Sequence, residues 1–385
     1  MTAIDKVILW DSGIKTLVNE GALPDTKIIS FTVTESGYFL DDDGELDLAD
    51  KAIRADLKGE EETRTLYGAL TKILRARMQQ QSSPVTLLNC DNLRHNGDAI
   101  RHGLNTFISA LNEPELQNWV NHNISTPNGM VDRITPKFDE EIFARLKEQN
   151  ITDDNALLTC EHFAQWVIED DFIAGRPPLE EAGVEFVSDV LPYEEAKIRV
   201  LNASHSGVAW AGGVMGKKYI DQSLSPQVAS WITAYVTEEL QAALGDTAIN
   251  LEEYSATTLE RFGNKWVRDT VQRVSSDSIA KLHEFIVPTL KTRYQQGAVP
   301  SAALILVALY FCFMRQRHQG KLACDYLDST LDDVDFAAIF TADDPVAAFA
   351  GTRKLFGSLS RRAELAEDLR RAIEIVENNL INRGD

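Results

Sequence analysis

The chain has 385 residues, enough for two domains with separate cores, because a single core stops growing at roughly 250–300 residues. Its 44% hydrophobic and 25% charged residues are ordinary for a globular protein, and its net charge of -21 argues against nucleic acid as a partner, since such a surface repels phosphate backbones. The four cysteines (Cys90, Cys160, Cys312 and Cys324) show no CxxC spacing, which argues against a disulfide framework and a structural zinc site, so we predict no metal.

The first part of the chain shows the pattern of a parallel sheet. The N-terminal residues MTAIDKVILWDSG do not form a signal peptide, so we expect a cytoplasmic protein. Two β-rich runs, 27–34 (KIISFTVT) and 84–90 (PVTLLNC), flank an amphipathic helical pattern over 62–79. A strand, a helix and a strand in this order predict a βαβ unit. Asn92 follows the second strand, at the end where α/β sheets bind ligands.

From about residue 193 the pattern becomes helical. Helical periodicity covers 193–215, 226–244, 259–273, 280–296, 301–317 and 355–379. We therefore predict an α/β plus α protein: an incomplete Rossmann-like parallel-sheet domain over 1–190 and a mainly helical substrate domain over 191–385.

The most apolar run lies within this helical part. It is SAALILVALYFCFM (301–314), which is shorter than the ~20 residues needed to cross a bilayer. Because RQRH follows it directly, we predict a buried core helix and no membrane association.

The segment 192–207 (PYEEAKIRVLNASHSG) is the strongest candidate for chemistry. On an α-helix with ~100° per residue, Lys197, Asn202 and His205 fall at about 0°, 140° and 80°, so all three can point into one cleft. A desolvated lysine can act as a base near neutral pH, and an asparagine or histidine can bind a substrate oxygen. The spacing alone leaves the plainer interpretation open, in which Lys197 is solvated and His205 is an ordinary partly buried histidine.

Four blocks of the sequence resemble the polyol-specific long-chain dehydrogenases, the mannitol dehydrogenase family. They are TVTESGY (32–38), NCDNLRHNG (89–97), PNGMVDRITP (127–136) and PYEEAKIRVLNASH (192–205). Their order and separations match the family, and the resemblance runs over essentially the whole chain. It implies an oxidoreductase that uses a nicotinamide cofactor and no metal, and we expect a monomer.

The resemblance also implies roles for residues at the matching positions. Lys197 resembles the general base that takes the proton from the oxidised hydroxyl. Asn92 and Asn202 resemble the pair that holds the substrate oxygen. Glu194 resembles a carboxylate that assists proton exchange with solvent. His205 resembles a substrate-hydroxyl contact.

Further family positions bind the cofactor and the outer part of the substrate. Asp132 resembles a polar position near the nicotinamide and the lysine. Thr34 and Glu35, with Asn92 and Asp132, are the implied cofactor-binding residues. In RVSSDSIAK (273–281), Arg273 and Lys281 would bind outer hydroxyls.

Within the family, TLLNCDN, EEAKIRVLNASHS, EDDFIAGRP and DDPVAAFA are similar to the subgroup that acts on D-arabinitol. This similarity implies NAD-dependent oxidation of D-arabinitol to D-xylulose. The alternatives within the enzyme class are a mannitol 2-dehydrogenase and a hexuronate reductase such as fructuronate reductase.

The sequence departs from the family at one point. Family members begin with a strand and a glycine-rich loop of the GxGxFHRAH kind, which binds the cofactor pyrophosphate. This motif is absent from the sequence, and the acidic residue that holds the adenosine ribose would lie with it. We therefore expect either a fragment of the enzyme or a truncated, non-catalytic polyol-binding remnant.

Overall fold

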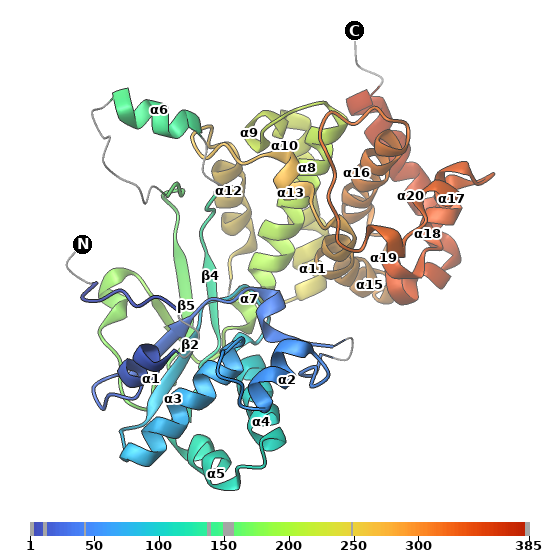
Figure 1. Ribbon diagram of the computed structural model, residues 1–385. Helices are drawn as coiled ribbons and strands as arrows, with labels where there is room; N and C mark the ends of the chain where they lie inside the picture. The colour runs from blue at the N-terminus through green and yellow to red at the C-terminus, as the bar shows by residue number, and fades with distance from the viewer. Residues whose placement is uncertain are drawn as a thin grey trace. The chain divides into compact units, whose positions relative to one another are not determined.

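The computed structural model describes residues 4–10, 14–41, 44–136, 140–148, 158–247 and 249–381. The chain divides into two compact units (Figure 1). Unit 1 comprises Met1–Asp132 and Ala164–Leu191, and unit 2 comprises Arg133–Phe163 and Pro192–Asp385. Each unit has its own hydrophobic core. The predicted division into domains at residue 190 stays a prediction.

Unit 1 is built on a parallel sheet. Its elements are α1 (Lys15–Gly21), β1 (Ile28–Phe31), the 3₁₀ turn η1 (Glu35–Tyr38), α2 (Lys51–Leu57), α3 (Leu66–Gln80), β2 (Val85–Asn89), α4 (Asn96–Ala110), α5 (Pro114–Asn123), β3 (Ile124–Ser125), β4 (Gly129–Asp132), β5 (Gln165–Glu169), the 3₁₀ turn η2 (Leu179–Ala182) and β6 (Glu185–Val187). The order β1-β2-β3 is parallel throughout, so the predicted βαβ unit is confirmed.

The predicted strands and helix of this unit differ from the observed ones only at their ends. α3 begins at Leu66, after Thr65, whose hydroxyl accepts a hydrogen bond from the Gly68 N–H at 3.0 Å and so caps the helix. Leu70 and Leu74 of α3 are buried beside β2, α4 and α5. A second sheet, with β4 antiparallel to β5 and β6 parallel to it, was not predicted.

Unit 2 is helical in its described residues. It contains α6 (Glu140–Glu148), α7 (Leu191–Ala196, whose first residue closes unit 1), α8 (Ala203–Val214), α9 (Ile220–Ser223), α10 (Pro226–Ala234), α11 (Gln241–Leu244), α12 (Leu251–Phe262), α13 (Val271–Ser275), α14 (Ser278–Lys281), α15 (Val287–Gln295), α16 (Ser301–His318), α17 (Phe336–Thr341), α18 (Pro345–Ala350), α19 (Arg353–Phe356) and α20 (Ala363–Val376). Four π-helical segments, η3 (Lys197–Asn202), η4 (Tyr235–Leu240), η5 (Leu282–Ile286) and η8 (Glu377–Ile381), and two 3₁₀ turns, η6 (Leu331–Asp333) and η7 (Gly357–Arg361), complete it.

Two predicted helices of unit 2 are wrong in part. The pattern over 259–273 is interrupted, because α12 ends at Phe262 with Gly263 as its cap, and the chain forms a loop before α13. The pattern over 355–379 starts too early, because Gly357 has a positive φ of 53° and turns the chain before α20 begins at Ala363.

The predicted core helix is confirmed. Every residue of α16 from Ala302 to Met314 is buried, and α16 packs against α8 and α20. α8 has small residues on the side that faces α16. A Cβ added at Gly213 would lie 2.4 Å from the ring of Phe313, so glycine is required for this close approach.

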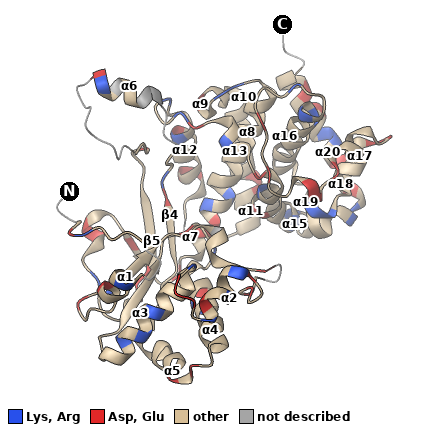
Figure 2. Cartoon of the chain, in the orientation of Figure 1, with Lys and Arg blue, Asp and Glu red and all other residues tan. Residues whose placement is uncertain are grey.

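None of the helices in the described ranges combines the length and apolar character that crossing a membrane requires. Acidic and basic residues are spread over the helices of both units (Figure 2).

Candidate active site

In unit 1, the residues that follow β1 and β2 meet at one edge of the sheet. Because the two strands are parallel and adjacent, their carboxyl ends lie side by side. The buried carboxylate of Asp91 accepts hydrogen bonds from the backbone N–H groups of Val33 (3.0 Å) and Thr34 (2.8 Å) and from the Tyr38 hydroxyl (2.8 Å). This carboxylate therefore fixes the backbone that leaves β1.

Thr34 has a backbone conformation that is rare for a β-branched residue. Its φ is 63° and its ψ is 171°, a region in which non-glycine residues are strained. The two hydrogen bonds to Asp91 on either side of the Val33–Thr34 peptide hold this conformation. As a result Thr34 is exposed at the edge of the sheet.

The other predicted cofactor residues of unit 1 lie near strand ends. Asn92 follows β2 and is exposed, whereas Asp132 is the last residue of β4 and is buried. The side chain of Glu35 lies outside the described part of the structure.

In unit 2, Glu194, Lys197 and Asn202 lie on one continuous helical run formed by α7, η3 and α8. Glu194 and Lys197 are buried, with exposed fractions of 3% and 7%, and Asn202 is half-buried. Glu194 precedes Lys197 by three residues, a spacing that makes side chains neighbours on a helix. The interpretation of Lys197 as a solvated surface lysine is therefore wrong.

The helical angles predicted for this run need correction. They assumed a regular α-helix, but Lys197–Asn202 forms a π-helical turn with i→i+5 hydrogen bonding. Residues five positions apart then lie more nearly above one another than the 140° predicted between Lys197 and Asn202. The wide turn brings these two side chains toward the same direction.

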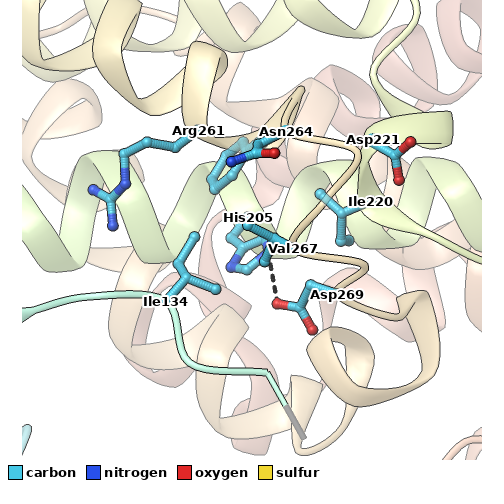
Figure 3. A pocket seen from close by; sticks show the side chains of 9 residues that line it. Ile134, His205, Ile220, Asp221, Arg261, Asn264, Val267 and Asp269 are labelled. Atoms are coloured by element: carbon cyan, nitrogen blue, oxygen red, sulfur yellow. Dashed lines mark ion pairs between the residues drawn. The ribbon is translucent and has the colours of Figure 1, made fainter. Parts of the chain in front are cut away.

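His205, in the first turn of α8, contributes to a pocket within unit 2 (Figure 3). The pocket is lined by Ile134, His205, Ile220, Asp221, Arg261, Phe262, Asn264, Val267 and Asp269. The imidazole ring stacks on Phe262 at a centroid distance of 4.5 Å, and its Nε2 lies 3.6 Å from Oδ2 of Asp269. These contacts fix the plane of the ring.

The surroundings of His205 keep it neutral. Burial lowers the pKa of His205 from 6.5 to about 4, although the Asp269 carboxylate opposes this shift. The cations Arg273, Lys281 and Arg261 lower the pKa further. At neutral pH the imidazole can thus both donate and accept a hydrogen bond.

Asp269 links His205 to Arg273. The Arg273 guanidinium donates to both carboxylate oxygens of Asp269, from Nε to Oδ1 at 2.6 Å and from Nη2 to Oδ2. Asp269 is buried and Arg273 is about 39% exposed, so the carboxylate anchors an arginine that reaches toward solvent. The structure therefore brings the predicted residues His205 and Arg273 together through a third residue.

Lys281, the other predicted cation, lies at the end of α14. Burial lowers its pKa to about 8, and its Nζ donates to the backbone carbonyl of Val274 at 2.8 Å. This contact ties the lysine to the helix that carries Arg273.

A buried ion pair supports the pocket from the side of α12. Arg261 donates to both carboxylate oxygens of Glu161, at 3.0 and 2.7 Å, and both side chains are at most 5% exposed. Glu161 also accepts from the Ile134 N–H at 2.6 Å, and Arg261 lies 4.0 Å from the ring centre of Phe163. The pair holds the segment before α6 and the segment after it against α12.

Sequence reasoning missed Asp269, Arg261 and Glu161. For Asp269 a signal existed, since it precedes Arg273 by four residues, which is the spacing of a helical ion pair. The predicted helix over 259–273 contained both residues, but Gly263-Asn264 was not taken as a helix end, so the loop that carries Asp269 was missed. Glu161 and Arg261 are 100 residues apart, and no sequence pattern joins them.

All four cysteines are free thiols. Among the described residues, no group of three or more His, Cys, Asp or Glu side chains is placed to hold a metal ion.

Comparisons with known proteins match both parts of the chain to one family. Residues 1–181 match the mannitol dehydrogenase Rossmann domain, and residues 189–377 match the mannitol dehydrogenase C-terminal domain. A D-arabinitol 4-dehydrogenase of Klebsiella pneumoniae is 44% identical over 98% of this chain and 82% of its own length.

Two solved structures share the fold. The substrate-free D-sorbitol dehydrogenase has a TM-score of 0.84 at 31% identity, over 94% of this chain and 75% of its own. The mannitol 2-dehydrogenase of Pseudomonas fluorescens, solved as a ternary complex with NAD and D-mannitol, has a TM-score of 0.81 at 30% identity, over 99% of this chain and 78% of its own. Both support the predicted combination of a Rossmann-type domain and a helical domain.

Proposed function

The chain belongs to the mannitol dehydrogenase family of polyol dehydrogenases, and from this membership we propose that it oxidises D-arabinitol to D-xylulose with NAD. The observation that carries the choice of substrate is the 44% identity, over 98% of the chain, to a D-arabinitol 4-dehydrogenase. The buried Glu194 and Lys197 on one helical run support the chemistry.

The residues of unit 1 fit the nicotinamide end of the cofactor. The carboxyl edge of a parallel sheet is where such folds bind nucleotides, and at this edge Asp91 holds Thr34 in an exposed, strained conformation. Thr34, Glu35, Asn92 and Asp132 are the residues that we propose would hold the cofactor. When bound, NAD supplies the acceptor for a hydride from the substrate carbon.

Lys197 would act as the general base that removes the proton of the substrate hydroxyl. Oxidation of a CH–OH group releases a hydride and a proton, and a positioned base is worth roughly 10²–10⁴-fold in rate. Glu194, one helical turn earlier, would pass the proton toward solvent. Asn202 would donate a hydrogen bond to the reacting oxygen, and we propose the same role for Asn92.

The outer hydroxyls would meet His205, Arg273 and Lys281. Neutral His205 can accept a hydroxyl proton in a hydrogen bond, and Arg273 retains donors beyond those engaged by Asp269. The pairing of Arg273 with Asp269 and of Arg261 with Glu161 also bears on specificity. Because both guanidinium groups already face carboxylates, neither offers a free positive charge to the carboxylate of a hexuronate, which supports a neutral polyol as the substrate.

The first test measures NADH formation with D-arabinitol and D-mannitol, and NADH consumption with fructuronate. We expect D-arabinitol to have the highest kcat/KM, and NAD to be used in preference to NADP. A preference for D-mannitol or fructuronate would assign one of the alternative activities. Polyol binding without turnover would instead support the non-catalytic binding function.

The second test addresses the base. Lys197→Ala should lower kcat for polyol oxidation by at least roughly a hundredfold, with little change in the Kd for NADH. The exposed Lys291 of α15 provides the control, and Lys291→Ala should leave kcat unchanged. If His205→Ala were the severe variant and Lys197→Ala mainly raised KM, His205 would be the base.

A further inference from the structure

The π-helical turn that begins at Lys197 is held from outside the run to which it belongs. The backbone carbonyl of Arg199, in the middle of η3, accepts a hydrogen bond from the hydroxyl of Tyr235 at 2.9 Å. Tyr235 is the first residue of η4 and is fully buried. A buried tyrosine thus contacts the backbone of the turn on which Lys197 and Asn202 lie.

The Arg199 side chain is fixed at the same place. Its Nε and Nη2 donate to the Thr289 hydroxyl of α15 at 3.2 and 3.0 Å, and its Nη1 lies 3.4 Å from a carboxylate oxygen of Glu195. The Tyr235 hydroxyl lies 3.4 Å from the same Thr289 oxygen. Backbone and side chain of one residue in η3 are therefore held by η4 and α15 together.

The contacts of Tyr235 and Thr289 with Arg199 bear on why η3 is π-helical. A wide i→i+5 turn is rare and occurs mostly as a single turn inside an α-helix, so hydrogen bonds from outside the run can decide whether it persists. The hydrogen bond from Tyr235 to the Arg199 carbonyl is shielded from water, since Arg199, Tyr235 and Thr289 are all at most 6% exposed, and losing a buried hydrogen bond is unfavourable. Burial raises the pKa of Tyr235 to about 12, so its hydroxyl remains a donor throughout the working pH range.

We propose that Tyr235 is a positioning residue of this enzyme: by donating to the Arg199 carbonyl, it keeps η3 π-helical and so sets the direction of Lys197 and Asn202. The inference rests on the proposed role of Lys197 as the base. Without the hydroxyl, the turn can relax toward a regular α-helix, which rotates Lys197 relative to Asn202. Misplacement of a catalytic group by about 1 Å can cost roughly a hundredfold in rate.

The test compares two tyrosine-to-phenylalanine variants in the full chain. Tyr235→Phe removes the hydroxyl that contacts η3, and Tyr294→Phe removes the hydroxyl of another buried tyrosine, which donates to Asp368 at 2.9 Å. For Tyr235→Phe we expect kcat to fall about tenfold to a hundredfold and the acidic limb of the pH–kcat profile, which reports the ionisation of the base, to shift. KM for the polyol should change less than kcat, and the Kd for NADH should not change.

For Tyr294→Phe we expect a wild-type pH profile. A wild-type Tyr235→Phe enzyme, or two variants that lose activity only in proportion to their folded fraction, would overturn the proposal. Should Tyr235→Phe fail to fold, Thr289→Val keeps the shape of the threonine but frees the Arg199 side chain. It should shift the pH profile in the same direction, and an unshifted profile would overturn the proposal.

Lys197→Ala, measured in the same series, separates the two hypotheses. Wild-type turnover of Lys197→Ala would reject the proposed function. An inactive Lys197→Ala enzyme beside an unaffected Tyr235→Phe enzyme would reject only the positioning role.

Discussion

The two units hold their buried carboxylates in different ways. In unit 1, Asp91 accepts from two backbone N–H groups and one hydroxyl, at a position where adjacent parallel strands end. In unit 2, Glu161 is held by the side chain of Arg261, 100 residues later, and Asp269 by that of Arg273, four residues later. In unit 1 the sheet brings the donors to the carboxylate together, whereas in unit 2 the carboxylates depend on pairing with individual arginine side chains.

This difference has consequences for function. A carboxylate that binds backbone fixes the path of the chain, and Asp91 does this at Thr34, which we propose as a cofactor-binding residue. A carboxylate that binds a guanidinium fixes a side chain and cancels its charge, and Asp269 does both for Arg273. We infer that buried carboxylates position the backbone in unit 1 and side chains in unit 2.

Among the variants that test this difference between the units, Arg261→Met should have the largest effect on the free energy of unfolding. The variant leaves the Glu161 carboxylate buried without its guanidinium, and breaking such a pair typically costs about 3–5 kcal/mol. We expect this loss in the free energy of unfolding, measured by urea denaturation. Arg370→Met, which breaks an exposed pair with Asp344, should change stability little. Equal losses in both variants would show that burial does not distinguish the pairs.

The same comparison explains how much the sequence could predict. β1, α3 and β2 were predictable because strand and helix periodicity are local properties, and α16 was predictable because it is apolar all round. The predicted end of β2 also placed Asn92 at the carboxyl edge of the sheet. The family resemblance then supplied Lys197, Asn202 and His205 as candidates.

Other features of unit 2 could not be predicted. The π-helical turn at Lys197 depends on Tyr235 and Thr289, and the Thr289 hydroxyl contacts a residue 90 positions earlier. The loop after Phe262 places Asp269 beside His205, a contact between residues of different elements. Such contacts depend on helix packing, which periodicity does not specify.

The second prediction concerns pH. The pKa of His205 is about 4 in the folded chain and 6.5 as a free side chain, so the unfolded chain binds more protons between these values. The stability that this neutral histidine contributes is therefore complete above pH ~6.5 and is lost as the pH falls toward ~4, by up to about 3 kcal/mol. The measurement is the free energy of unfolding as a function of pH.

His205→Gln should flatten this dependence, because it removes the group that must stay neutral. His122→Gln, at an exposed histidine of α5, provides the control and should retain the wild-type slope. If His205→Gln kept the full loss of stability between pH 6.5 and 4, the burial of His205 would not be its origin.

The smallest effect should come from Asp91→Asn in unit 1. An asparagine oxygen can still accept from the Val33 or Thr34 N–H, but its amide group cannot accept from the other donors, so we expect a loss of about 1–2 kcal/mol in stability. The more informative readout is cofactor binding. If Asp91 holds Thr34 in its strained conformation for the nicotinamide, the Kd for NADH should rise about fivefold, which corresponds to ~1 kcal/mol.

The pH profile of kcat provides a second readout for Asp91→Asn. Because Asp91 acts through the backbone of unit 1, Asp91→Asn at saturating cofactor should keep the wild-type pH profile of kcat, unlike Tyr235→Phe. Asp25→Asn, an exposed change of the same charge in unit 1, should leave both the Kd for NADH and kcat unchanged. An Asp91→Asn enzyme that binds NADH normally but has a shifted pH profile would contradict the separation of roles, since backbone anchoring in unit 1 would then act on the base in unit 2.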